Sequence, residues 1–377
     1  MQYKNIIRIL GLLVALLSVT MLPPALVSMI YRDGGGVPFL LGFFWCLVTG
    51  FVAWYPNRYQ KNDLRAREGF LIVVLFWLVL ASFSAIPLIL LEQPSLSITD
   101  AFFESFSGLT TTGATILNHI EGLPHAVLWY RQQLQWLGGM GIIVLAVAVL
   151  PMLGIGGMQL YRAETPGPVK DSKMTPRIAD TAKHLWYIYL SLTIACAVAY
   201  WLAGMSGFDA ICHSFSTIAI GGFSTHDASM GYFNSPTINL VCVFFLVISG
   251  VNFALHYAVV QSKSLKSYFY DPEFKVFIAI QVVLALICFT VLMSFGTYDD
   301  AGQAFDQALF QSVSISTTAG FATTSFADWP TLLPILLIFS SFIGGCAGST
   351  GGGMKVVRVL LLYLQGLREL NKLVHPK

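Results

Sequence analysis

The sequence predicts an all-α polytopic membrane protein, with two N-terminal helices followed by three repeats of a span, a short helix and a second span. Composition gives the first reason, because the chain of 377 residues is 56% hydrophobic and only 11% charged, against about 25% charged in soluble domains. The second reason is a series of long, nearly charge-free segments. The third is a short polar pattern that occurs three times between such segments.

Eight apolar segments are the expected spans or parts of spans. Several reach the roughly 20 residues that a helix needs to cross a bilayer. The first could be mistaken for a signal peptide, but its apolar run is too long and no small-residue cleavage site follows it, so we expect a retained helix. The segments are Ile6–Ile30, Phe39–Tyr55, Phe70–Leu91, Ile142–Met152, Trp186–Leu202, Ile238–Val260, Val276–Met293 and Leu332–Ile343.

The basic residues predict the orientation of these spans. If the N-terminus is cytoplasmic and the spans alternate, 19 of the 21 Lys and Arg lie on the cytoplasmic side, and only Arg32 and Arg131 lie outside. In the same arrangement 11 of the 19 acidic residues lie outside. The outer face is therefore predicted to be acidic, and an acidic vestibule concentrates cations.

The six cysteines lie singly in or beside apolar segments, without metal-ligand spacing or a disulfide framework. We expect them to pack as small hydrophobic side chains. The spans contain no HExxH or GxSxG signature and no pair of aspartates. The short polar pattern that occurs three times between the spans also lacks a nucleophile beside a base, so the sequence does not predict an enzyme.

Three gap-free copies of one unit appear when three alanines are aligned. The stretches read AFFESFSGLTTTGAT from Ala101, AICHSFSTIAIGGFS from Ala210 and ALFQSVSISTTAGFA from Ala308. In each copy the spacing from the alanine to a glycine is twelve, and a serine lies six residues before that glycine. We expect each stretch to begin as a short helix capped by an acidic residue, at Asp100, Asp209 and Asp306.

A helix of about ten residues is too short to span, so the chain is expected to re-enter through membrane depth as non-helical backbone. Such backbone is tolerated only where protein buries it or where it lines a water-filled cavity. Its carbonyl oxygens can replace the hydration shell of a cation, and glycine allows the backbone to turn them inward. Hydroxyls of Thr and Ser add oxygen ligands, and Phe223 and Phe321 are placed to wedge the loops against their scaffold.

The strips contain oxygen ligands but no carboxylate, which favours a monovalent cation over a divalent one. The competing interpretation is that the small residues only allow helices to pack closely. Three copies, each following a capped short helix, favour the ion-binding interpretation.

Two motifs resemble the potassium transporter superfamily that includes the Trk, Ktr and HKT proteins, and most closely its bacterial Trk-type uptake subunits. They are WLGGMGIIVLAVAVLPMLGIGGMQLYRAETPGP (Trp136–Pro168) and GGCAGSTGGGMKV (Gly344–Val356). In that family two extra helices precede four span–pore helix–span repeats around one pore. The resemblance implies extra helices in residues 1–60 and pore repeats in residues 68–165, 180–265 and 272–370, the third with a broken last helix. The fourth repeat is absent from this sequence, and we expect either a truncated, non-conducting fragment or a fourth wall from another chain.

The resemblance implies that three residues in each strip contact potassium and form its selectivity filter. In relatives the glycine of each loop is tied to potassium preference, and serine in the first loop accompanies sodium transport. The expected filter residues are Thr111, Thr112, Gly113, Ile220, Gly221, Gly222, Thr318, Ala319 and Gly320, with metal contacts from Thr111, Thr112, Ile220, Gly221, Thr318 and Ala319.

The resemblance also implies an intramembrane gate in the glycine-rich stretch that interrupts the last span. Six glycines in ten residues do not hold a straight helix, and a loop of low stability moves for little energy. The lysine is not placed as a phosphate-binding GxxxxGK[ST] loop requires; it either faces the pore or extends to the interface. The gate residues are Gly344, Gly345, Gly348, Ser349, Thr350, Gly351, Gly352, Gly353 and Lys355.

Five further polar residues lie in the expected membrane segments. Asn252 and His256 are four apart on one expected helix, which favours a hydrogen bond between helices over ion contact. Glu104, His213 and Gln311 occupy matching places in the three short helices. We expect these three to anchor their helices.

The resemblance implies potassium uptake across the bacterial inner membrane, with the ion as substrate and no cofactor. Proton symport and channel-like flux both stay open, and sodium or poorly selective cation transport is the alternative. The implied partners are a second copy in a homodimer, the lipid bilayer and a cytoplasmic nucleotide-binding regulatory subunit. That subunit is expected on the basic loops Tyr161–Lys183 and Lys263–Lys275, and no nucleic acid is implied.

Overall fold

The computed structural model describes residues 3–59, 66–139, 141 and 178–374, and within these ranges every regular element is a helix. The all-α class is therefore confirmed for the described part of the chain. The expected span Ile142–Met152, most of the motif Trp136–Pro168 and most of the loop Tyr161–Lys183 lie outside the described residues.

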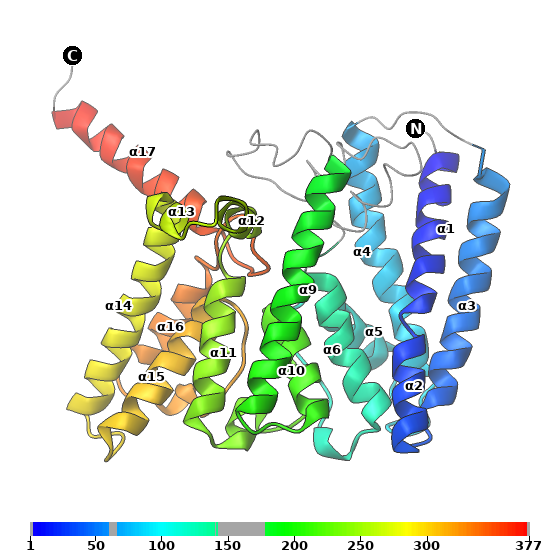
Figure 1. Ribbon diagram of the computed structural model, residues 1–377, viewed down its shortest axis with the longest axis horizontal. Coiled ribbons are helices and arrows are strands. Elements are labelled where there is room, and N and C mark those ends of the chain that lie inside the picture. Colours follow the sequence, from blue (N-terminus) through cyan, green and yellow to red (C-terminus); the bar gives the residue numbers. More distant parts are fainter. Residues whose placement is uncertain (1–2, 60–65, 140, 142–177, 375–377) are drawn as a thin grey trace. The chain divides into compact units, whose positions relative to one another are not determined.

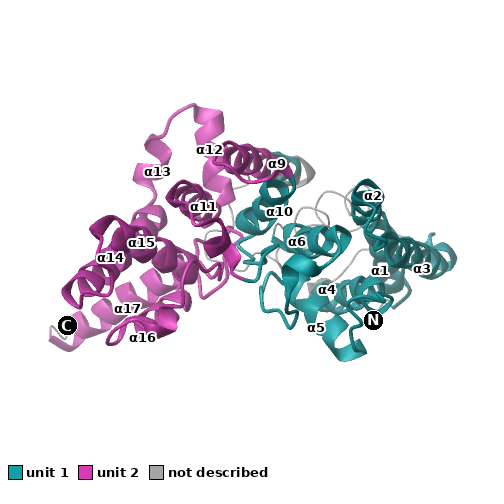
Figure 2. Ribbon diagram, turned by 90° about the horizontal axis from the view of Figure 1, so that it is seen from below, with its two compact units in different colours: residues 1–187, 208–227 teal, residues 188–207, 228–377 magenta. Residues whose placement is uncertain are grey.

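The chain forms two compact units (Figure 2). Unit 1 comprises residues 1–187 and 208–227, and unit 2 comprises residues 188–207 and 228–377. The division runs through α9 (Ile178–Leu202), which begins the second expected repeat. The units therefore do not follow the repeat boundaries expected from the sequence.

Unit 1 begins with a tightly packed helical hairpin (Figure 1). A Cβ atom on Gly50 would lie 2.6 Å from the carbonyl oxygen of Gly11 and 2.5 Å from the nitrogen of Ala15. Small residues at such crossings allow two backbones to approach closely. The hairpin consists of α1 (Tyr3–Val19), α2 (Leu22–Tyr31) and α3 (Gly36–Trp54).

The rest of unit 1 follows the expected order of a long helix, a short helix and a second long helix. These are α4 (Ala66–Ile89), α5 (Ile98–Leu109) and α6 (His125–Gly139), and unit 1 also contains most of the short helix α10 (Gly207–Ile218). The expected cap at Asp100 is wrong, because the hydroxyl of Ser97 caps α5 by accepting from the nitrogen of Asp100 at 3.1 Å.

Unit 2 does not repeat this order of lengths, because α14 of 23 residues precedes α15 of 16 residues and α16 of only 9 residues. Its α-helices after α9 are α11 (Pro236–Ser249), α12 (Phe253–Ser262), α13 (Lys266–Tyr270), α14 (Pro272–Ser294), α15 (Ala301–Ser316), α16 (Leu333–Ser341) and α17 (Val356–Val374). Asp300 caps α15 by accepting from the nitrogen of Gln303 at 2.8 Å. Asp306 is the sixth residue of that helix, so its expected role as a cap is wrong.

The expected apolar segment Ile238–Val260 is not one continuous helix. It is bent by 91° between α11 and α12. Asn252 is the N-cap residue of α12, and its side chain accepts from the nitrogen of Ala254 at 2.8 Å. The ring of His256 contacts the Tyr268 hydroxyl on α13 at 2.7 Å and the Ile248 carbonyl on α11 at 3.0 Å, so His256 makes the expected hydrogen bonds between helices.

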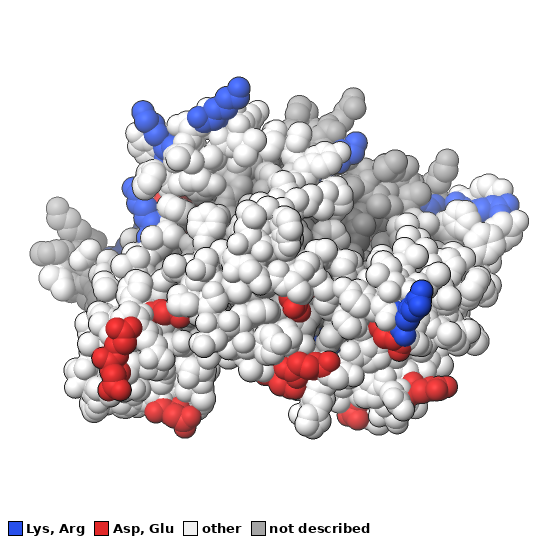
Figure 3. Space-filling model, turned by 60° about the horizontal axis from the view of Figure 1, so that its bottom comes forward, with Lys and Arg blue, Asp and Glu red and all other residues white. Residues whose placement is uncertain are grey.

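Five helices in the described residues are long and apolar enough to cross a membrane, or six if the bent pair counts as one. They begin with Tyr3–Tyr31, so the expected first span persists across the short break between α1 and α2. Charges segregate along these helices: in the view of Figure 3, acidic side chains gather toward one end of each unit and most basic ones toward the other. We refer to the first as the acidic end.

Candidate functional site

The three polar strips are Thr111–Gly113, Ile220–Gly222 and Thr318–Gly320, called the first, second and third strip. Each starts at the C-terminus of a short helix in the same way. A serine carbonyl accepts from the nitrogen five residues later, at 2.9 Å from Ser107 to Thr112, 2.8 Å from Ser216 to Gly221 and 2.9 Å from Ser314 to Ala319. The residue directly before that donating nitrogen adopts the left-handed conformation, as in a Schellman helix end. These residues are Thr111, Ile220 and Thr318, with φ of 55°, 53° and 71°.

The backbone of each strip then alternates in the sign of φ. The glycine two residues on is also left-handed, with φ of 75° at Gly113, 79° at Gly222 and 81° at Gly320, while the residue between has negative φ. A β-branched residue with positive φ is a conformational outlier, and such strain costs about 1–3 kcal/mol and clusters at functional sites. Threonine and isoleucine in this conformation therefore mark the strips as more than ordinary helix ends.

The alternation leaves most carbonyl oxygens of the strips without a hydrogen-bond donor. Of the nine expected filter residues, only Gly221 has a carbonyl oxygen that accepts a hydrogen bond within the described part of the chain. Two of the eight other residues, Ile220 and Ala319, are buried, where an unpaired carbonyl is rare. Thr112 and Gly320 are exposed, and the remaining four are half-buried. All eight carbonyls are free of a donor from the described chain, which an ion-binding carbonyl needs.

The first two strips meet within unit 1. A Cβ atom added to Gly113 would overlap the carbonyl oxygen of Gly221, so only glycine fits there. Gln135 on α6 holds the second strip with both ends of its buried amide. Its Nε2 donates to the Gly221 carbonyl at 2.6 Å, and its Oε1 accepts from the nitrogen of Phe223 at 3.1 Å.

A buried ion pair involves the residue of α6 one turn before Gln135. Arg131 Nε is 2.6 Å from Glu104 Oε1, and both side chains are almost fully buried. The guanidinium also donates to the Ser224 carbonyl at 3.3 Å and lies 4.3 Å from the centre of the Phe223 ring. Arg131 was counted with the outer charges; in the structure it is buried and joins the irregular segments that follow the first and second strips, at Thr115 and Ser224.

The expected anchoring role is supported by the contacts of the three matching residues. Glu104 accepts from the Thr115 hydroxyl at 3.0 Å. His213 Nδ1 is 2.9 Å from the Asp209 carbonyl, which only accepts, so Nε2 accepts from the Ser224 hydroxyl at 2.9 Å. Gln311 Nε2 donates to the Thr324 carbonyl at 3.1 Å. A side chain of each short helix thus holds the irregular segment that follows the strip of the same repeat.

The glycine-rich stretch closes the break between α11 and α12. The carbonyl of Gly250 accepts from the nitrogen of Cys346 at 2.8 Å, and the nitrogen of Phe253 donates to the carbonyl of Gly348 at 3.0 Å. Helix ends leave backbone groups unsatisfied, and none can be left bare at membrane depth. The loop supplies the missing partners of both helix ends.

One carboxylate holds both ends of this loop. Glu273 Oε1 accepts from the nitrogen of Ala347 at 2.7 Å and from that of Val357 at 3.0 Å. Lys355 has φ of 71°, is half-buried and donates to the Gly351 carbonyl within the same loop. The nitrogen of Gly352 donates to the Thr318 hydroxyl at 2.8 Å, which joins the loop to the third strip within unit 2.

Sequence reasoning missed three of these residues: Arg131, Gln135 and Glu273. For α6 a signal existed, because the run RQQLQ at 131–135 places charged and amide side chains in a helix between apolar segments, and polar groups inside a membrane are functional by default. The role of Glu273 gave no signal in the sequence, because an acidic residue in the first turn of a helix, here next to Pro272, is common.

Comparison with known proteins gives the family. The TrkH family profile, described as cation transport protein, matches residues 36–377. The chain belongs to the TrkH family of cation transport proteins. It is 68% identical over its full length to the Trk system potassium uptake protein TrkH of Vibrio parahaemolyticus, and 63% identical to that of Escherichia coli K12, covering 78% of each.

The solved structure of a relative has the same fold. The crystal structure of the potassium transporter TrkH from Vibrio parahaemolyticus matches with a TM-score of 0.90 at 64% identity, covering all of this chain and 78% of that one. The described helices of this TrkH-family chain thus form a polytopic membrane fold. The relatives are named as potassium uptake proteins, which agrees with the prediction that the chain is not an enzyme.

Proposed function

We propose that this protein takes up potassium across the bacterial inner membrane. Ions collect at the acidic end, lose water to the carbonyl and hydroxyl oxygens of the three strips, and pass the loop Gly344–Gly353. An inside-negative potential drives entry with about 2.3 kcal/mol per charge per 100 mV. The observation that carries this proposal is the φ alternation in all three strips, with eight carbonyl oxygens that lack a donor in the described chain.

The filter consists of Thr111–Gly113, Ile220–Gly222 and Thr318–Gly320, and the glycine loop below it is the gate. Residues 68–165, 180–265 and 272–370 form three pore repeats, and the N-terminus is cytoplasmic. The chain functions as a homodimer with a cytoplasmic nucleotide-binding regulatory subunit. Family membership and the names of the relatives support potassium as the substrate.

The direct test is growth and rubidium-86 uptake in a bacterium without its own potassium uptake systems, expressing the protein from its full reading frame. We expect growth at submillimolar potassium and uptake that excess potassium inhibits more strongly than excess sodium. Equal inhibition by both ions would support the sodium or non-selective alternative. The absence of any uptake from protein present in the membrane would overturn the proposal.

Proton coupling is tested separately. In proteoliposomes with potassium gradients of known size, channel-like flux gives a reversal potential that follows the potassium gradient alone. A reversal potential that also moves with the pH gradient indicates symport.

A further inference from the structure

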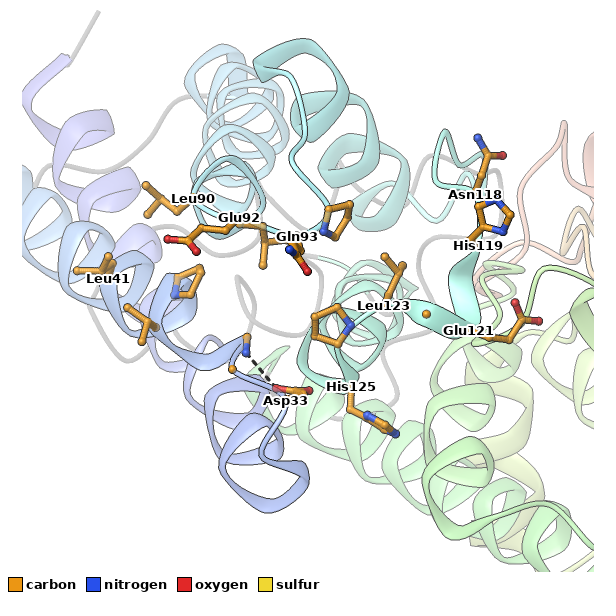
Figure 4. A pocket seen from close by; sticks show the side chains of 18 residues that line it. Asp33, Leu41, Leu90, Glu92, Gln93, Asn118, His119, Glu121, Leu123 and His125 are labelled. Atoms are coloured by element: carbon orange, nitrogen blue, oxygen red, sulfur yellow. Dashed lines mark hydrogen bonds between the residues drawn. The ribbon is translucent and has the colours of Figure 1, made fainter.

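Two cavities, one in each unit, differ in whether a residue that lines them has a buried polar atom without a hydrogen-bond partner. The larger cavity, of about 1000 Å³ in unit 1, is drawn in Figure 4. Its Asp33 accepts hydrogen bonds from the Ser28 hydroxyl and the nitrogens of Gly35 and Ala126, and none of its lining residues has such an atom. The smaller cavity, of about 440 Å³ in unit 2, is lined by a residue that has such an atom.

That atom is Oδ1 of Asn239 on α11. Asn239 is 4% exposed and lines the smaller cavity. Its Nδ2 donates to Asp306 Oδ2 at 2.7 Å, and because a carboxylate accepts, this bond fixes which end of the amide is oxygen. Oδ1 has no donor within the described residues. A buried amide oxygen without a partner costs about 1–3 kcal/mol, so the position calls for a donor or a cation.

The remaining lining is rich in oxygen and negative. Asp306 and Asp300 supply carboxylates, Gln303 and Gln307 supply amides, and no Lys or Arg is among the residues that line the cavity. Asp300 is already engaged as the cap of α15, which leaves Asp306 as the principal charge. One available carboxylate with neutral oxygens suits a monovalent cation, whereas a divalent site favours several carboxylates.

The cavity also adjoins the irregular segment that follows the third strip. The Thr323 hydroxyl donates to Gln307 Oε1 at 2.5 Å, and both residues line the cavity. The nitrogen of Gly231, another lining residue, donates to the Ala322 carbonyl at 3.0 Å. Gly320 lies only two residues before Ala322. The cavity is therefore bounded by the segment that leaves the third strip.

We propose that this cavity is a loading site for a hydrated monovalent cation, held by Asp306 and Asn239 Oδ1 ahead of the filter. A water occupies about 30 Å³ of liquid volume, so 440 Å³ accommodates an ion with several of its waters. The filter discriminates between ions, and the loading site sets how much potassium reaches it. The inference rests on the proposed function for its role in transport, but not for the binding itself.

The binding test is anomalous X-ray scattering from crystals of the protein soaked in rubidium chloride. We expect a rubidium peak between Asp306 and Asn239 in the wild type, and its loss in Asp306→Asn and in Asn239→Leu. Asp328→Asn is the matched control, because Asp328 is an exposed carboxylate at the same end of unit 2 that does not line the cavity. A wild-type cavity without rubidium, or a peak that survives both cavity variants, overturns the inference.

The transport test separates this site from the filter. In rubidium-86 uptake, Asp306→Asn is expected to raise the apparent Km for potassium about tenfold, the size of effect that a vestibule charge has on local ion concentration. The preference for potassium over sodium stays unchanged, and Asp328→Asn changes neither. Equal shifts in Asp306→Asn and Asp328→Asn would mean a general surface-charge effect and contradict the loading site. A wild type without potassium uptake would sink the proposed function, while the rubidium peak would still decide the binding site.

Discussion

The amide of Gln135 holds the carbonyl of Gly221 at 2.6 Å, so a side chain of the first expected repeat fixes the backbone of the second strip. Gly221 O is thereby the one oxygen among the nine expected filter carbonyls that already has a donor in the described chain. The same amide fixes the nitrogen of Phe223. Strip two is thus held from α6 rather than from its own short helix alone.

Replacing Gln135 by Leu is expected to loosen strip two without removing an ion ligand. The preference for potassium over sodium should fall about tenfold, since a change of 1.4 kcal/mol is a factor of ten and one hydrogen bond contributes about that much. Competition of potassium and sodium for rubidium-86 uptake measures it. Gln133→Leu is the control, because Gln133 on the same helix donates to the Thr20 carbonyl, away from the strips. Equal loss of preference in both variants would assign the effect to α6 as a whole.

Gly113→Ala is expected to reduce potassium preference more than Gly320→Ala. Both glycines have φ near 80°, at 75° and 81°, so both substitutions carry the same backbone strain, about 1 kcal/mol. Only at Gly113 does the added methyl meet another strip, at the Gly221 carbonyl; nothing lies within 4 Å of the Gly320 position in the described chain. The same uptake competition compares them. A larger effect at Gly320 would contradict the contact between strips one and two as the determinant.

The buried pair of Arg131 and Glu104 gives a prediction about stability. Arg131→Met leaves a carboxylate buried without its partner, which costs about 3–5 kcal/mol of unfolding free energy. Adding Glu104→Gln should recover much of that loss, because the uncompensated charge is gone. Chemical denaturation of the purified protein in detergent measures the four members of this cycle. If the double variant is as unstable as the sum of the single ones, the two side chains act independently.

Glu273→Leu is expected to increase potassium flux through the resting protein severalfold. It removes the acceptor of the Ala347 and Val357 nitrogens and frees both ends of the glycine loop. Glu273→Gln keeps an oxygen in that place, so it should behave almost as the wild type. Single-channel or liposome flux recordings without the regulatory subunit provide the measurement. A silent Leu variant that is present in the membrane would argue that the loop does not obstruct the pore.

The pH dependence of stability is predicted from Asp33, in the loop between α2 and α3. Burial alone raises the pKa of Asp33, but hydrogen bonds from Ser28, Gly35 and Ala126 outweigh it and lower the pKa below its usual value. With a lowered folded pKa, the stabilisation is fully present above about pH 4 and is lost as the pH falls through the folded value. The difference in Tm between wild type and Asp33→Asn should therefore shrink below about pH 4. A difference that is constant from neutral to acidic pH would contradict this.

Periodicity and composition predicted the helices, but not where they break. Ile238–Val260 reads as one apolar span, because the partners that stabilise its break at 250–252 come from a loop almost 100 residues later in the chain. The caps at Asp100 and Asp306 were wrong because the repeat alignment was taken to fix the helix start, whereas Ser97 and Asp300 lie earlier and offer the same acceptor chemistry.

The strips themselves were predictable because their glycines repeat at a fixed spacing, and the structure adds the left-handed residue at the start of each. The positions of Gln135 and Glu273 could not be predicted. Each binds backbone atoms far away in sequence, and the repeat alignment carries no information on those contacts.

The bonds from Glu104 to Thr115, from His213 to Ser224 and from Gln311 to Thr324 each close within a single copy of the duplicated segment. Glu104 also compensates the buried charge of Arg131, so an exchange of its carboxylate for an imidazole or an amide requires a change at Arg131 as well. His213 and Gln311 bond to a neutral hydroxyl and a backbone carbonyl, so their places require only a polar side chain that reaches from the short helix to the returning segment. Chemically different side chains thereby hold three strips whose backbones are alike.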